Sequence, residues 1–205
     1  MKDKNYHDYV IRDGKFIGEF EEMYKDCDDP WMQSEQPNKY ARSAAFWHIR
    51  NFHIKRILEC GSGLGYYSDW IRKETGIIPI GLDVSETSVV KARELFPDLV
   101  FEQADISKDL HKYTDVDCVL FSEIMWYILP QLDGILEDLK AHFAGKYLLV
   151  NQVFYKGSQK YGREYFTTMR ELHDYFGFEV LAQCEATTVN DSTIETSSLM
   201  LIPKK

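Results

Sequence analysis

Residues 56–71 read Arg-Ile-Leu-Glu-Cys-Gly-Ser-Gly-Leu-Gly-Tyr-Tyr-Ser-Asp-Trp-Ile, and this stretch decides the fold. A short apolar run ends in the acid Glu59, glycines follow at positions 61, 63 and 65, and an amphipathic segment then begins. The pattern predicts a buried strand, a tight turn and the start of a helix. Glycine lets a ligand approach the backbone closely, and a helix N-terminus offers free N–H groups. We therefore expect the first strand and the ligand-binding turn of an α/β sheet.

The composition is that of a folded globular protein. The 205 residues are 44% hydrophobic, which predicts a sizeable core. A net charge of −9 opposes a large nucleic-acid interface, because that needs clustered Lys and Arg. The N-terminus is polar, and no apolar run approaches the length of a membrane span. We expect a cytoplasmic protein that binds neither nucleic acid nor membranes.

Cysteine and histidine spacing predicts no metal site. The cysteines, at positions 27, 60, 118 and 184, include no C-x-x-C pair, and two of them lie in apolar strand-like runs. Cysteine behaves there as a small hydrophobic residue, and scattered thiols of this kind are typical of a reduced cytosolic protein. The histidines lack the spacing of zinc ligands.

Strand and helix patterns alternate along the chain. A turn is expected at Asp13-Gly14. Two N-terminal helices should follow it, one with apolar positions between residues 16 and 24 and one over 38–53, with a loop over 29–38 between them. Strands are predicted over 54–59, 77–82, 100–103, 117–122 and 147–153, and helices over 66–75, 86–95, 132–143 and 167–176. Extended runs over 178–188 and 193–203 flank Asn190-Asp191 and predict a hairpin.

These elements predict one α/β domain over residues 1–205. Its centre is a seven-stranded, mostly parallel, doubly wound sheet that ends in an antiparallel C-terminal hairpin. We divide the domain into an N-terminal helical cap (1–53), a ligand-binding core (54–155) and a C-terminal helix and hairpin (156–205).

Acidic residues follow successive strands. Glu59 ends the first predicted strand, Asp83 ends the second, Asp105 lies after the third, and Ser122-Glu123 end the fourth. In doubly wound sheets the ligand lies outside the carboxyl ends of the strands, so these groups should meet in one crevice. An acid at the end of the second strand suits the two hydroxyls of a ribose.

Two departures from nucleotide-binding motifs limit which ligands the turn can bind. Tyr66 occupies the position of the third glycine in a dinucleotide fold, and no lysine of the Walker type follows the turn. A carboxylate at Glu59 would repel a pyrophosphate but could help to fix a cationic amino-acid group. The sequence therefore favours an adenosine with a zwitterionic, positively charged tail, which is S-adenosylmethionine (SAM).

The chain resembles the class I SAM-dependent methyltransferases. Residues 59–65, Glu-Cys-Gly-Ser-Gly-Leu-Gly, fit their E/D-x-G-x-G-x-G motif, and the acids after the next two strands fit their ribose and adenine positions. The resemblance covers roughly residues 54–155 and implies S-adenosylhomocysteine (SAH) as the product. It implies cofactor-binding roles for Glu59 (methionine amine), Gly61 and Gly63 (backbone packing), Asp83 (ribose), Val84, Asp105 and Ile106 (adenine), and Ser122 and Tyr66 (methionine side). Packing at the helix N-terminus is an equal alternative for Tyr66.

A narrower resemblance is to the nodulation-type N-methyltransferases. It rests on Asp29-Pro30-Trp31 before a basic helix and on residues 122–129, Ser-Glu-Ile-Met-Trp-Tyr-Ile-Leu. The resemblance implies that Trp31 and Arg42 close over the methionine end of SAM. The amino-sugar substrate of those enzymes is not carried over.

Methyl transfer from a sulfonium is an in-line displacement, so alignment supplies much of the rate. A base is needed only where the acceptor must lose a proton, and Glu123 is the candidate catalytic group. Capping of the turn that follows it is the alternative. Tyr127, Tyr155, Tyr161 and Tyr165 could line the acceptor pocket, although each could equally serve packing.

The expected function is SAM-dependent methyl transfer to N or O of a small soluble acceptor, such as a metabolite, an amino sugar or a natural-product-like compound. A protein methyltransferase that uses the acids Glu22, Asp26 and Asp28 to bind a basic partner is one alternative. A non-catalytic SAM-binding protein is another, and a nicotinamide oxidoreductase is a more distant one. The sequence leaves the acceptor, the methylated atom and the oligomeric state open.

Overall fold

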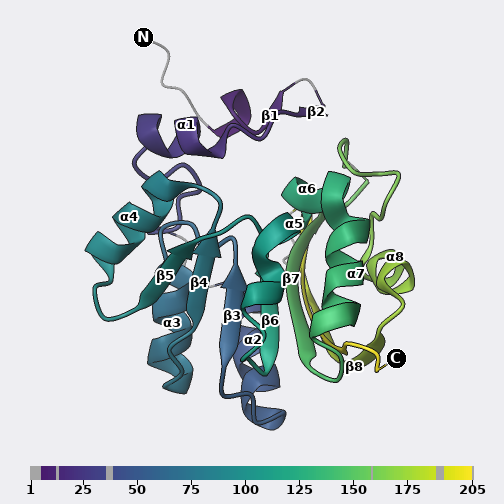
Figure 1. The fold of residues 1–205 in the computed structure, drawn as a ribbon. Coiled ribbons are helices and arrows are strands. Elements are labelled where there is room, and N and C mark those ends of the chain that lie inside the picture. Colours follow the sequence, from purple (N-terminus) through teal and green to yellow (C-terminus); the bar gives the residue numbers. More distant parts are fainter. Residues whose placement is uncertain (1–5, 13, 36–38, 158, 188–191, 205) are drawn as a thin grey trace.

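The computed structural model describes residues 6–12, 14–35, 39–157, 159–187 and 192–204. In this part of the chain, a seven-stranded sheet with the order β5-β4-β3-β6-β7-β9-β8 forms the centre of the molecule (Figure 1). Its strands are β3 (Ile57–Cys60), β4 (Ile80–Asp83), β5 (Val100–Gln103), β6 (Cys118–Ser122), β7 (Tyr147–Tyr155), β8 (Glu179–Ala186) and β9 (Thr193–Leu201).

Helices cover both faces of this sheet (Figure 1). They are α1 (Phe20–Asp26), α2 (Tyr40–Asn51), α3 (Tyr66–Thr75), α4 (Glu86–Leu95), α5 (Ile106–Asp109), α6 (Met125–Ile128), α7 (Leu132–His142) and α8 (Met169–Phe176), with short 3-10 turns at Tyr6–Asp8, Leu110–Lys112 and Leu129–Gln131. No helix in the described ranges is long and apolar enough to cross a membrane.

The sheet confirms the predicted topology. Strands β5, β4, β3, β6 and β7 pair in parallel, and β9 pairs antiparallel with both β7 and β8. The predicted turn at Asn190-Asp191 and residue Asp13 lie outside the described residues. Crossover connections place every parallel strand in the same direction, so their carboxyl ends lie on one edge.

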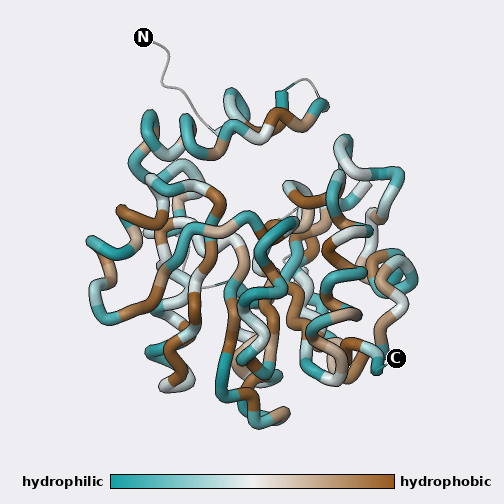
Figure 2. The backbone as a smooth tube through the Cα atoms, in the orientation of Figure 1, coloured by the Kyte–Doolittle hydropathy of each residue, from teal (hydrophilic) through white to brown (hydrophobic). Residues whose placement is uncertain are grey.

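The two faces of the sheet have separate hydrophobic cores because side chains alternate across it. Leu58 and Cys60 face the core beneath α7 and α8, whereas Ile57 faces the core beneath α2 and α3. All five residues of β6 are buried, as expected of a central strand covered on both faces. Figure 2 shows hydrophobic stretches along the strands and mixed polarity along the surrounding helices.

The structure corrects several predicted bounds. Strand β3 begins at Ile57 rather than at residue 54, and β4 begins at Ile80 rather than at residue 77, directly after Pro79, which has no N–H for a strand ladder. Four short elements were not predicted: β1 (Ile11–Arg12), β2 (Lys15–Phe16), α5 and α6. Each is at most four residues long, too short to show a hydrophobic period.

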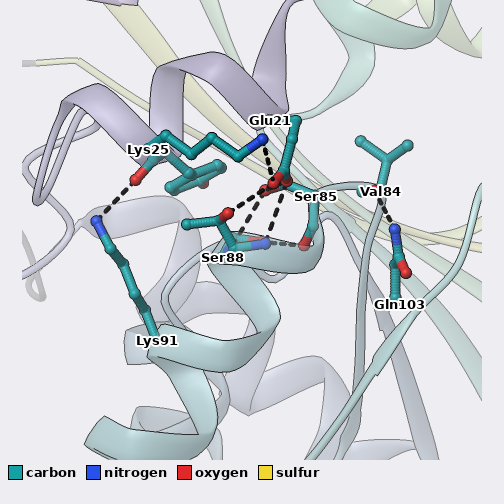
Figure 3. A network of polar contacts seen from close by, with 9 residues as sticks. Glu21, Lys25, Val84, Ser85, Ser88, Lys91 and Gln103 are labelled. Atoms are coloured by element: carbon teal, nitrogen blue, oxygen red, sulfur yellow. Dashed lines mark hydrogen bonds and ion pairs between the residues drawn. The ribbon is translucent and has the colours of Figure 1, made fainter.

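The N-terminal segment lies across the carboxyl edge of the sheet, where α1 docks on the start of α4 (Figures 1 and 3). Glu21 on α1 accepts hydrogen bonds from Ser85 Oγ at 2.7 Å and from the Thr87 N–H at 3.1 Å and hydroxyl at 2.6 Å. At the other end of the contact, Lys91 Nζ donates to the carbonyls of Tyr24 and Cys27, at 2.7 and 3.1 Å. A carboxylate thus meets a helix N-terminus and an ammonium meets helix C-terminal carbonyls, which are both favourable pairings.

We predict that Glu21→Gln loosens this docking. Burial acts to raise the pKa of Glu21, but hydrogen bonds from Thr87 and Ser85 outweigh it and hold the pKa at about 2. The unfolding free energy at neutral pH should fall by roughly 0.5–1 kcal/mol, the scale of a lost helix-terminal carboxylate. Because the folded pKa is depressed, this contribution is present above the ordinary value of 4.5 and is lost as the pH falls towards 2.

Urea unfolding at pH 7 and pH 3 measures this effect. The neighbouring variant Glu22→Gln is the matched control, because Glu22 is exposed and carries the same charge. Equal unfolding midpoints for the two variants at pH 7 would contradict the role given to Glu21.

Candidate functional site

A cavity of about 380 Å³ opens at the carboxyl edge of the sheet. Its floor comes from the ends of β3, β4 and β6. Its wall and roof come from residues between 16 and 33, from Lys39 and Arg42, and from the segment after β6. Its volume lies in the range of small-molecule sites. Ten of the sixteen predicted site residues line it: Trp31, Arg42, Gly61, Asp83, Val84, Asp105, Ile106, Ser122, Glu123 and Tyr127.

The turn after β3 forms one edge of this cavity. Gly61 and Ser62 both donate their N–H to the carbonyl of Leu82, at 2.7 and 2.9 Å, so the turn is tied to the end of β4. Gly61 has a φ of +73°, and a Cβ on it would lie 2.3 Å from Ile124 Cγ2. Only glycine combines this backbone conformation with this close approach.

Asp83 anchors the same turn from the end of β4. One carboxylate oxygen accepts the Gly63 N–H and the other accepts the Ser85 N–H, each at 2.9 Å. Burial raises the pKa of Asp83, while the hydrogen bonds from Ser85 and Gly63 act to lower it. Each oxygen can still accept a second hydrogen bond, so the carboxylate can also receive hydroxyl donors from the cavity.

The end of β5 supplies Asp105 and Ile106. Asp105 caps α5, accepting hydrogen bonds from the Ser107 N–H at 3.0 Å and the Ser107 hydroxyl at 2.6 Å, and it pairs with Lys108 at 2.7 Å. Its carboxylate is therefore partly engaged within its own turn. Ile106 and Val84 give this end of the cavity apolar surface, which suits a flat heterocycle.

Two cations and one acid form the opposite wall. Lys39 Nζ lies 2.7 Å from Glu123 Oε2, and Arg42 lies 3.6 Å from Glu123 Oε1. Glu123 has a φ of +61°, a left-handed conformation that is uncommon for a residue with a side chain. No side chain caps the start of α6, so Glu123 pairs with the cations instead of capping the turn after it.

Aromatic side chains cover this wall. The rings of Trp31 and Tyr127 have centroids 5.2 Å apart, and those of Phe20 and Tyr127 are 5.8 Å apart. Trp31 Nε1 donates to Tyr24 Oη at 3.0 Å. The N-terminal segment and the segment after β6 thus share one aromatic roof over the cavity.

Six predicted residues lie outside the cavity lining. Gly63 is covered by Tyr24 and Gln33, whose polar atoms would lie within 3 Å of a Cβ on it, and the ring of Tyr66 packs edge-on against Phe96 at 5.2 Å. The three other tyrosines pack or face solvent: Tyr161 stacks on Phe16, Tyr165 packs on Tyr175, and Tyr155 is 43% exposed. The position of Tyr66 agrees with the packing alternative.

Glu59 is the sixth of these residues. It alternates with Leu58 and Cys60, so it points to the face under α2 and α3, where Ser68 donates to it. Burial raises the pKa of Glu59 to about 7, although the Ser68 hydrogen bond and the charge of Arg42 oppose the shift. Glu59 can therefore influence the cavity only through the turn and through Arg42.

This shift predicts a pH dependence of stability. The folded pKa of Glu59 lies above the ordinary value of 4.5, so ionisation is disfavoured in the folded chain. Its effect on stability therefore becomes unfavourable as the pH rises from 4.5 through 7. We expect Glu59→Gln to lose less unfolding free energy than the parent between pH 5 and pH 8, measured by urea unfolding. If the unfolding free energies of the two proteins changed with pH in parallel, a raised pKa at Glu59 would be excluded.

Lys39 and Gln33 are site residues that the sequence analysis missed. Gln33 Oε1 accepts the Leu64 N–H at 2.8 Å, so it holds the loop after α1 on the glycine turn. Lys39 is the N-cap residue of α2 and precedes Arg42 by three positions, so both cations lie at the same end of that helix. That spacing was the available signal for Lys39.

Within the described residues, no three His, Cys, Asp or Glu side chains gather in a way that could hold a metal ion. The acids proposed to attract a basic partner lie away from the cavity. Asp26 accepts from Tyr9 Oη at 2.6 Å, Asp28 lies 3.7 Å from Lys91, and Glu22 is exposed.

Comparison with known proteins identifies the fold. No protein-family model and no curated protein match the chain. Among solved structures, the N-methyltransferase NodS of Bradyrhizobium japonicum, in complex with SAH, has a TM-score of 0.66 at 12% identity, over 91% of this chain and 98% of that one. A SAM-dependent methyltransferase of Methanosarcina mazei has a TM-score of 0.62 at 13% identity, over 77% and 98% of the two chains.

The methyltransferase domain of bacterial CtHen1 has a TM-score of 0.63 at 12% identity, over 78% of this chain and 96% of that one. At such identities the likeness concerns the fold. The chain has the fold of the class I SAM-dependent methyltransferases, as its glycine motif and strand-end acids predicted.

Proposed function

We propose that this protein is a SAM-dependent methyltransferase that acts on N or O of a small soluble acceptor. The observation that carries the proposal is the single cavity in which the glycine turn, the acid after β4 and the acid after β5 meet. Its fold is that of SAM-dependent enzymes, one of which was solved with SAH. The reduced cysteines fit the cytoplasmic location that we also propose.

The residues of the cavity fit SAM. Gly61 and Ile124 both line the cavity, and the missing Cβ of Gly61 lets Ile124 pack directly against the turn. Ser122 Oγ is buried at the cavity and has no hydrogen-bond partner among the described residues. A buried hydroxyl of this kind favours a polar ligand group beside it.

In this proposal each residue has one role. Asp83 accepts the ribose hydroxyls, Val84 and Ile106 pack on the adenine, and Asp105 accepts from its amino group. Trp31, Arg42 and the backbone near Ser122 hold the methionine end, while Glu59 supports the turn from behind. When bound, SAM supplies an activated methyl group.

On the acceptor side, Glu123 is the polar group and Tyr127 is part of the aromatic roof. Glu123 can orient an amine or hydroxyl and can accept a proton from it where the acceptor must lose one. The roof excludes water and holds the acceptor in line with the methyl group, which supplies much of the rate. A small, flat or apolar acceptor fits such a space.

Asp83→Ala tests the cofactor-binding role in the proposed function. We expect SAM and SAH binding to weaken by about 1–3 kcal/mol, because ribose hydroxyls would lose their acceptor. Isothermal calorimetry measures the affinity. Since Asp83 also accepts the Gly63 N–H and so holds the turn, the unfolding midpoint of the variant is measured beside its affinity, and Asp83→Asn, which keeps one oxygen acceptor, is the matched variant. Unchanged affinity in Asp83→Ala would remove the ribose role.

Glu123→Gln tests the role of this carboxylate toward the methyl acceptor. SAH production from SAM is followed with a panel of small amines, amino sugars and hydroxyl compounds, and the acceptor that reacts is then used with the variant. We expect kcat to fall by about a hundredfold, the lower end of what a general base contributes, without weaker SAM binding. A variant that keeps full turnover would remove Glu123 from the mechanism.

A further inference from the structure

Lys39 and Arg42 place two positive charges against one carboxylate at the cavity wall. Lys39 Nζ is 2.7 Å from Glu123 Oε2, the nearest Arg42 nitrogen is 3.6 Å from Glu123 Oε1, and all three residues line the cavity. Their side chains are only 22%, 9% and 27% exposed. The group has a net charge of +1, so it attracts a further anion.

Arg42 is held in place by an aromatic ring. The Arg42 guanidinium stacks on the buried Tyr67 ring at 4.7 Å, and Asn151 donates to Tyr67 Oη at 2.9 Å. Both cations belong to the start of α2, whose first turn contains no acidic residue. Glu195 of β9 accepts the Ala41 N–H at 3.1 Å, so a carboxylate already lies at the positive end of this helix, and the attraction for a further anion comes from the two side chains.

Glu123 reaches the cations from a strained backbone. Its N–H donates to the carbonyl of Asn151 at 2.8 Å, as if β6 continued, but its φ of +61° then turns the chain out of the sheet. Left-handed conformations at residues with side chains persist where surrounding contacts impose them, and they cluster at functional sites. The ion pairs are the contacts that Glu123 itself makes in the cavity.

We propose that Lys39 and Arg42 form a carboxylate site for which Glu123 and the amino-acid carboxylate of SAM or SAH compete. This inference rests on the proposed function. A ligand carboxylate that takes the two cations releases Glu123, which then points to the acceptor. Glu123 thus acts as an internal carboxylate that ligand binding displaces.

The alternative is that Glu123 holds the ammonium group of the ligand directly. The two alternatives predict opposite changes in SAH affinity when the Glu123 carboxylate is removed, because removing a competitor strengthens binding whereas removing a partner weakens it. Isothermal calorimetry with SAH separates them. 5′-Methylthioadenosine is the second probe, since it has the adenosine and the thioether but no carboxylate.

We expect Glu123→Gln to bind SAH roughly twofold to fivefold more tightly than the parent, the scale of one partly exposed ion pair. Its affinity for 5′-methylthioadenosine should not change. Lys39→Met should weaken SAH binding by a similar factor and leave 5′-methylthioadenosine unaffected. Glu74→Gln is the matched control, because it removes one carboxylate from the exposed pair with Arg50.

Glu123→Gly guards against a folding defect, since glycine adopts a positive φ without strain. It should tighten SAH binding as Glu123→Gln does. Equal or weaker SAH binding in both Glu123 variants would overturn the inference, as would an equal gain for 5′-methylthioadenosine. If neither nucleoside binds the parent protein, the proposed function itself fails, and the inference falls with it.

Discussion

The hydrogen bonds between the glycine turn and the end of β4 are the constraint on which the site depends. The carbonyl of Leu82 accepts two N–H groups from the turn, and the carboxylate of Asp83 accepts a third, from Gly63. The turn must adopt left-handed backbone to make these bonds, which only its glycines do without strain. Because Gly61 has no Cβ, the chain after β6 can lie against it at Ile124. Three strand ends are thereby joined in one floor.

The roof depends on a second constraint, the docking of the N-terminal segment. Charged side chains at both ends of the α1–α4 contact complement helix termini, so this short segment is held without a large core of its own. Gln33 holds the following loop on the glycine turn through the Leu64 N–H. The aromatic residues of both segments then meet the segment after β6. The N-terminal segment thus supplies aromatic side chains that line the cavity, whereas Tyr161 and Tyr165 of the C-terminal loop pack outside it.

The fold was largely predictable, whereas the positions of Tyr161 and Tyr165, which we had expected in an acceptor pocket, were not. Helices α3 and α4 and strand β5 have the predicted bounds, because glycine, serine and proline punctuate a strong local pattern there. The residues after β4, β5 and β6 could be placed because parallel strands end on one edge. Tyr161 and Tyr165 could not be placed, since their neighbours, Phe16 and Tyr175, come from distant elements that no local pattern specifies.

The sequence by itself determined the order of strands and helices, the glycine turn and the acids that follow the strands, because all of these depend on local periodicity and backbone preference. Only the tertiary structure decided which charges meet. Glu123 is 84 residues from Lys39 along the chain, and their 2.7 Å contact exists because α2 and the end of β6 pack at the same edge. Likewise, Glu59 turned away from the cavity because strand alternation, read together with the packing of α2 and α3, assigns it to the opposite face.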